Sequence, residues 1–212
     1  MEREQVINGL SSSQGRKDEG PNIALAIQLA KHEDEQGVEH LIQIVTTEKA
    51  SLKHDAIKVL YETGARNPQL LSKHLKSFLE MLDSKNNRLQ WGAMTAIQTI
   101  TEIVPKQVYE NLVQIIHAGD KGSVISRDQM MRILYKLSTH QPYQKDALSL
   151  LFEQLRKCPT NQLPMYAEEL SNVLPSAYRN EMVSILRIRI SELEKASKIK
   201  RLEKVIRSMT AT

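Results

Sequence analysis

The chain has few of the residues from which disulfides, aromatic cores and membrane spans are built. Of its 212 residues only one is cysteine, Cys158, which has no partner for an intramolecular disulfide and indicates a reducing compartment. Aromatic residues make up only 4%, with a single tryptophan, Trp91. Met1–Leu10 contains no apolar run, and no stretch approaches the ~20 apolar residues of a membrane span. We therefore expect a soluble cytoplasmic protein with an aliphatic core.

Catalytic sequence motifs are also missing. The chain has no Gly-x-Ser-x-Gly elbow, no phosphate-binding glycine loop and no His-Glu-x-x-His pair. His54 and Asp55 are adjacent, but adjacent helical residues point about 100° apart, so we interpret them as a solvated pair. Possible metal ligands crowd residues 32–40 in nearly consecutive order and without cysteine, which is typical of a solvated charge run. We expect no catalysis, no cofactor and no metal.

What the sequence does contain is a repeat of 37 residues. Pro68, Pro105 and Pro142 have this spacing, and the apolar positions that precede them recur with it. Self-similarity at a period of roughly 20–50 residues is typical of stacked repeat proteins, in which each unit contacts mainly its neighbours. The repeat therefore predicts an elongated array rather than one or two globular domains.

Within each repeat the apolar residues recur every three or four positions, as in helices with one buried face. This spacing predicts a helix on each side of each proline, with Asp83 and Asp120 following the second helix of their units. Ile23, Ile27 and Ala30 are expected to form the apolar stripe of the first helix of the array. A fourth and less regular unit contains Pro175. The prolines are expected to lie in the turn within each unit.

These two-helix units resemble the HEAT/armadillo class of helical repeat proteins over Asn22–Leu193. The resemblance implies an all-α fold, a right-handed α-α superhelix of stacked helical hairpins. We expect residues 1–21 to form an N-terminal segment and flexible linker, and residues 22–193 to form an array of about four to five units. Residues 194–212 are expected to form a basic capping helix.

The positive charge of the chain is concentrated in its C-terminal part. The formal net charge is +4, but the residues from Arg187 onward carry eight Lys/Arg against three Asp/Glu, so the rest of the chain is nearly neutral. A pI of about 9.1 therefore describes the tail and not the repeats, and it gives no reason to expect nucleic acid along the array.

A non-enzymatic scaffold is the function that these features favour. A superhelix of helix pairs presents a groove, which we expect to be lined by the second helices and to bind a protein or peptide partner. Trp91 is either a packing residue between units or a binding anchor. The polar candidates on the second helices are Lys73, Lys76, Glu80, Gln107, Glu110, Gln114, Lys145 and Glu153.

Two alternatives remain open. The basic tail could contact nucleic acid or another anionic surface, through Arg187, Arg189, Lys195, Lys198, Lys200, Arg201, Lys204 and Arg207. Some HEAT-like proteins of similar size are DNA glycosylases, although the resemblance would then require a basic groove rich in aromatic residues. The apolar stripes of the terminal helix could instead pack on a second copy of the chain and form an oligomer.

Overall fold

The computed structural model describes residues 1–211, which form helices and turns and no strand. They divide into two compact units: unit 1 is Met1–Ile133, and unit 2 begins at Leu134. Unit 1 contains α1 (Arg3–Asn8), α2 (Gly20–Lys31), α3 (Glu35–Thr47), α4 (Ala50–Arg66), α5 (Gln69–Ser72), α6 (Leu75–Met81), α7 (Asn87–Ile100), α8 (Pro105–Glu110) and α9 (Leu112–Lys121). α10 (Val124–Ser138) spans the division, and unit 2 continues with α11 (Gln144–Lys157), α12 (Leu163–Val173), η1 (Ser176–Tyr178), α13 (Arg179–Arg189), η2 (Ile190–Glu192) and α14 (Ala196–Thr210).

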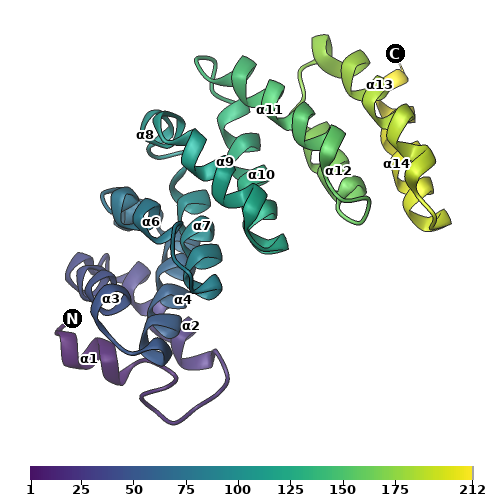
Figure 1. The fold of residues 1–212 in the computed structure, drawn as a ribbon. Coiled ribbons are helices and arrows are strands. Elements are labelled where there is room, and N and C mark those ends of the chain that lie inside the picture. The colour runs from purple at the N-terminus through teal and green to yellow at the C-terminus, as the bar shows by residue number, and fades with distance from the viewer. Residues whose placement is uncertain (212) are drawn as a thin grey trace. The chain divides into compact units, whose positions relative to one another are not determined.

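The helices of unit 1 form two layers (Figure 1). α4 packs along α2 on one side and along α7 on the other, so we call these three helices the first layer. α3 packs on α4, and α6 packs on α7, so α3, α5, α6, α8 and α9 form the second layer. The chain alternates between the layers, and the all-α repeat fold expected from the 37-residue period is confirmed.

The turn at Pro68 lies between two helix pairs and not within one, which corrects the sequence prediction for this unit. α6 packs on α7, which follows it across the Asp83 turn, and makes few contacts with α4, which precedes it across Pro68. In unit 2, α13 likewise pairs with α14. A helix with a broad apolar face has the same spacing of apolar residues whether it packs on the preceding helix or on the following one. The spacing alone therefore did not show which of the two forms the pair.

Two of the expected second helices are each divided in two. α5 and α6 replace the single helix expected between Pro68 and Asp83, and α8 and α9 meet at Asn111. At this residue the backbone leaves the helical region, and the Asn111 side-chain amide donates to the carbonyl of Gln107 at 2.8 Å. Asparagine side chains compete with the backbone for such carbonyls, which disfavours a continuous helix.

The predicted linker begins with backbone groups that are bonded to the repeats. The backbone N–H of Ser11 donates to Asn22, and that of Ser12 donates to Asp55 of α4, at 2.9 and 2.8 Å. Residues 13–20 are exposed. At the other end, α14 packs on α12 and α13, as a terminal helix would. The proposed boundaries at residues 21 and 193 remain predictions.

Asp55 and His54 are not the solvated pair that the sequence suggested. Asp55 is 9% exposed and accepts a hydrogen bond at 2.8 Å from the Asn22 side chain, in addition to that from Ser12. His54 turns toward Asn86, with its Nε2 2.8 Å from the asparagine nitrogen. The two side chains therefore diverge, as adjacent helical residues should, and Asp55 joins α2 to α4.

His74 makes the stability of unit 1 dependent on pH. Its side chain is 9% exposed, and burial lowers the pKa of its imidazole despite the Glu39 carboxylate 3.3 Å away. Because the folded pKa lies below the unfolded value of about 6.5, the unfolded state binds more protons, and stability is lost as pH falls from about 6.5 through the folded pKa.

We expect the melting temperature to fall less between pH 7.5 and 5.5 in His74→Gln than in the unmodified chain. Thermal melts monitored by circular dichroism, with the exposed His32→Gln as control, would measure this, and equal slopes in all three proteins would contradict it.

Among residues 1–211, none of the helices combines the length and the apolar character needed to cross a membrane.

Candidate functional site

Two glycines bring α4 and α7 of the first layer close together. A Cβ atom on Gly92 would lie 2.6 Å from Cγ1 of Ile57, and one on Gly64 would lie 2.3 Å from the Thr99 hydroxyl. Both distances are far below van der Waals contact, so a larger residue at either position would force the helices to move. This close approach also sets the distance between the side chains that α4 and α7 present to solvent.

An aromatic pair occupies the solvent side of this interface. The rings of Tyr61 on α4 and Trp91 on α7 lie 5.8 Å apart between centroids and are tilted by 49°. Both residues are half-buried, so each packs on its neighbour and still offers ring surface to solvent. Burial raises the pKa of the Tyr61 hydroxyl, which keeps that group neutral and able to donate a hydrogen bond.

Lys58 lies one helical turn before Tyr61 and connects the aromatic pair to two carboxylates. Its Nζ is 5.0 Å from the centroid of the Tyr61 ring and 2.9 Å from carboxylate oxygens of both Glu19 and Glu62. Burial opposes the charged form, but the hydrogen bonds to Glu19 and Glu62 outweigh it and raise the pKa of Lys58 above its ordinary value. Lys58 is therefore a fixed positive charge, and its side chain is only 10% exposed.

Two arginines complete the ionic network. Arg88, in the first turn of α7, places Nη2 3.4 Å from Glu19, while its Nε is buried and has no hydrogen-bond partner. Arg66 donates to Glu62 at 2.6 Å from the last turn of α4. Burial opposes ionisation of Glu62, but Arg66 and Lys58 hold the pKa of its carboxyl below the ordinary value.

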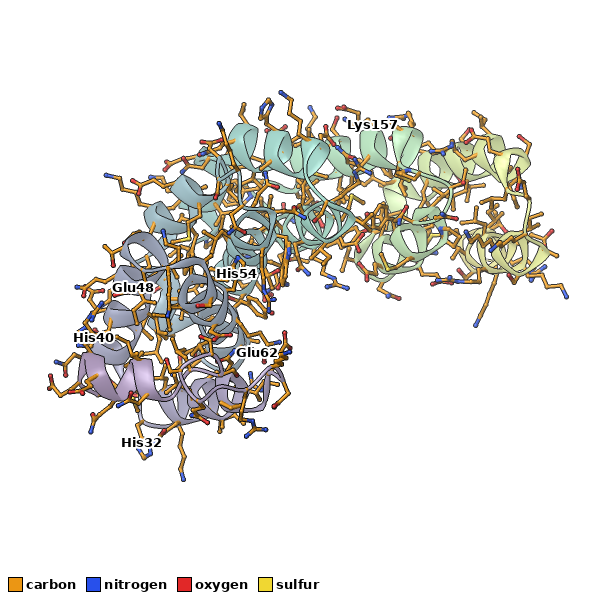
Figure 2. All side chains as sticks on the ribbon, turned by 60° about the horizontal axis from the view of Figure 1, so that its bottom comes forward. His32, His40, Glu48, His54, Glu62 and Lys157 are labelled. Atoms are coloured by element: carbon orange, nitrogen blue, oxygen red, sulfur yellow. The ribbon has the colours of Figure 1, made fainter. Side chains whose placement is uncertain are left out.

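We call this surface the α4–α7 face, defined by six residues: Glu19, Lys58, Tyr61, Glu62, Arg88 and Trp91. It combines aromatic rings, fixed charges of both signs and neighbouring hydrogen-bonding side chains. Figure 2 shows Glu62 and His54 on the side of unit 1 opposite His40 of α3 and Glu48, which follows that helix. The face is thus on the exposed side of the first layer, away from the second.

Of the predicted partner-binding residues, only Trp91 lies on this face. The others lie in the second layer of unit 1, with Lys73 in the turn between α5 and α6, or on α11 of unit 2, as follows: Lys73, Lys76, Glu80, Gln107, Glu110, Gln114, Lys145 and Glu153. Several of these have local partners. Lys73 pairs with Glu35 at 2.7 Å, and Gln114 donates to the Leu79 carbonyl at 3.0 Å. The structure does not gather them at Trp91, because Trp91 lies on α7 of the first layer.

The basic residues of the tail are divided between α13, α14 and the turn that joins them, and some are already paired. Arg201 donates to both carboxylate oxygens of Glu168 on α12, and Lys198 bonds to Asn161. Arg207 lies 4.0 Å from Glu203, a weak exposed contact. Exposed positive charge otherwise comes from Arg187, Lys195, Lys200 and Lys204.

Arg189 is not a surface residue, contrary to the sequence prediction. It is 7% exposed, and its guanidinium donates to the carbonyls of Leu155 and Cys158 at 2.6 and 2.8 Å and to Glu192 at 2.8 Å. These carbonyls lie at the C-terminal end of α11, where backbone groups lack helical partners. Arg189 therefore caps α11 and is not available to an anionic ligand.

The residues that sequence reasoning missed are Lys58, Tyr61 and Glu19. Lys58 and Tyr61 are three positions apart on one helix, and Tyr61 is one of few aromatic residues in the chain. This spacing could have placed them together. Nothing local indicates that Glu19, from the segment before α2, reaches them.

A hollow of about 750 Å³ lies elsewhere in unit 1, between α1, the following loop and α2. Its lining includes Gly9, Arg16, Ala24 and Gln28. Arg16 is already paired with Asp18 at 2.8 Å, and this hollow contains none of the predicted site residues. Within residues 1–211, no group of three or more His, Cys, Asp or Glu is placed to hold a metal ion.

No protein-family model matches the sequence, and a search of curated proteins finds no match. Solved structures do resemble this chain. A designed armadillo repeat protein in complex with the peptide (KR)4 is similar over 99% of this chain and 100% of that one, with a TM-score of 0.66 and 13% identity. An engineered protein is similar over 99% and 97%, with a TM-score of 0.65 and 14% identity. A computationally designed armadillo repeat protein for modular peptide recognition is similar over 98% and 99%, with a TM-score of 0.61 and 15% identity. The chain thus has the fold of HEAT/armadillo-like helical repeats.

Proposed function

We propose that this protein is a non-enzymatic scaffold that binds a peptide segment of a protein partner at the α4–α7 face. The observation that carries the proposal is the half-buried Tyr61–Trp91 pair, set beside fixed charges on the exposed side of the first layer. Tryptophan, tyrosine and arginine are the residues most often responsible for binding energy at interfaces. Rings held by packing lose little conformational entropy when a ligand covers them.

The similar structures support a repeat scaffold of this kind. Two of them are armadillo proteins, one in complex with a peptide and one designed for peptide recognition. Their identity to this chain is 15% or less, so they support the fold and the general mode of binding, not the choice of ligand.

A peptide array would test the proposal directly. Fluorescently labelled protein would be applied to an array of random dodecapeptides, and the affinities of the bound peptides would then be measured in solution by fluorescence anisotropy. We expect Trp91→Ala to weaken binding at least about tenfold, which corresponds to the loss of a typical anchor residue. Lys73→Ala, on the second layer, should leave binding unchanged.

Two outcomes would contradict the proposal. If no peptide binds, the chain is not a peptide scaffold of this kind. If Lys73→Ala or Lys76→Ala abolishes binding while Trp91→Ala does not, the binding surface is on the second layer, as the sequence first suggested. Circular dichroism of each variant would establish that it is folded.

A further inference from the structure

Glu19 places a carboxylate from the chain itself on the α4–α7 face. It is the last residue before α2 and ends an exposed stretch that starts at residue 13. Its two carboxylate oxygens contact different helices: Oε2 is 2.9 Å from Lys58 of α4, and Oε1 is 3.4 Å from Arg88 of α7. The cations at this end of the face are therefore arranged to receive one carboxylate.

Arg88 is not fully satisfied by Glu19, whereas Lys58 is bonded to Glu62 as well. The Arg88 contact is long for a charge-assisted hydrogen bond, which is typically about 2.7–2.9 Å. The buried Nε of Arg88 has no partner at all. A guanidinium binds a carboxylate best through two parallel N–H groups, and Arg88 uses only one of its groups, weakly, for Glu19. If the Arg88 side chain turned so that a ligand carboxylate engaged both Nε and Nη2, a buried donor that is now unpaired would be satisfied.

The two ends of the face differ in charge. Near the start of α7, Arg88 has only a long contact with Glu19, whose other carboxylate oxygen is bonded to Lys58, and Lys58 is bonded to Glu62 as well, so the least compensated positive charge is that of Arg88. Toward the end of α4, the Glu62 carboxylate is bonded to both Lys58 and Arg66. The Tyr61–Trp91 pair lies between α4 and α7 and next to Lys58. A ligand carboxylate is therefore favoured at the Arg88 end, next to the aromatic rings.

We infer that the peptide bound at this face is acidic, and that an Asp or Glu side chain of the ligand replaces Glu19 on Lys58 and Arg88. This inference rests on the proposed function and adds the ligand's chemistry to it. An apolar or aromatic ligand side chain adjacent to that carboxylate covers Tyr61 and Trp91. Glu19 is then an internal competitor, which holds the cations until the ligand displaces it. The ligand class differs from that of the armadillo neighbour solved with (KR)4.

The inference predicts opposite effects for two substitutions on the same ion pair. Three labelled peptides of equal length, (Glu-Phe)4, (Gln-Phe)4 and (Lys-Phe)4, would be titrated against the chain, with anisotropy and the fluorescence of the single tryptophan as readouts. We expect (Glu-Phe)4 to bind at least about tenfold more tightly than (Lys-Phe)4. Glu19→Gln should strengthen binding of (Glu-Phe)4 about three- to tenfold, and Arg88→Gln should weaken it about tenfold. Arg88→Lys keeps the positive charge but not the two parallel N–H groups, so its affinity for (Glu-Phe)4 should lie between those of the unmodified chain and Arg88→Gln.

The array separates failure of the inference from failure of the proposed function. If peptides bind in a Trp91-dependent way but are basic or neutral, or if Glu19→Gln weakens their binding, Glu19 belongs to the binding surface and the inference is wrong while the scaffold stands. If no peptide binds to any variant, both are wrong. The affinity for (Glu-Phe)4 should also fall as salt is raised from 50 to 500 mM, and a salt-independent affinity would count against the inference.

Discussion

Gly92→Ala should destabilise this protein, although replacing a glycine inside a helix by alanine normally stabilises it by about 1 kcal/mol. The new Cβ would lie 2.6 Å from Cγ1 of Ile57, which is fully buried and is not the flexible end of a long side chain. Overpacking of this kind typically costs about 1–3 kcal/mol. Chemical denaturation followed by Trp91 fluorescence would measure the loss, since Trp91 is adjacent to the substituted residue.

A double-mutant cycle supplies the control. Ile57→Ala removes the Cγ1 atom that the new Cβ would strike, at its own cost of about 2–5 kcal/mol for a cavity. In that background Gly92→Ala should become neutral or stabilising, with a coupling free energy of about 1–3 kcal/mol. If Gly92→Ala stabilises the unmodified chain, the helices are not held as closely as the structure shows. The distance that sets the Tyr61–Trp91 pair would then be wrong as well.

The all-α repeat could be predicted because its signal is local and recurs. Each helix must bury a broad apolar face, and the same positions meet the same neighbours in every unit, so the pattern returns every 37 residues. The positions at which helices begin and end could be predicted less well. The helix before Pro105 begins at Asn87, because the side chain of Asn86 accepts hydrogen bonds from the backbone of Arg88 and Leu89. An asparagine before an apolar run is a known N-cap signal, so the start of this helix could have been predicted from Asn86.

The assignment of residues to faces could not be predicted so well, because it depends on distant partners. Ile27 was expected in the apolar stripe of the first helix, but it is 47% exposed, while Leu25 and Leu29 are buried. α2 has a first-layer neighbour only on the α4 side. The stripe that contains Leu25 and Leu29 is therefore covered, and the one that contains Ile27 is not. Asp55 was expected in solvent and is instead bonded to Asn22, 33 residues away. Spacing along one helix contains no information on such contacts.

The candidate site shows the same limit. Trp91 was found from its rarity, but its neighbours depend on which helices lie side by side. The binding surface was predicted on the second helices, with Lys73 and Lys76, so Lys58 and Tyr61 of a first helix were not considered. In the structure the α4–α7 face brings together three residues of α4 and two of α7, and it adds Glu19 from a segment that the sequence describes only as a linker.

Arg189→Ala should destabilise unit 2 by about 2–4 kcal/mol, the second large effect that we expect. The guanidinium is buried and bonded to Leu155, Cys158 and Glu192. Its removal takes the charged donor away from two carbonyls at the end of α11, and hydrogen bonds to charged groups contribute about 1.5–3 kcal/mol each. The positive charge at the C-terminal end of α11 is lost as well. Arg189→Lys retains the charge but cannot reach both carbonyls, so its cost should be intermediate.

Arg187→Ala, an exposed change on the same helix, is the matched control and should alter stability by less than about 0.5 kcal/mol. Urea denaturation followed by circular dichroism would give the three free energies of unfolding, and amide hydrogen exchange would show whether the end of α11 opens first. The comparison also decides between two roles for a basic residue in this tail. If Arg189→Ala left stability unchanged and instead reduced the affinity for nucleic acid, Arg189 would have to be exposed. A stability loss confined to Arg189 would mean that part of the tail's positive charge serves to join α13 to α11, and only the remainder is available to a partner.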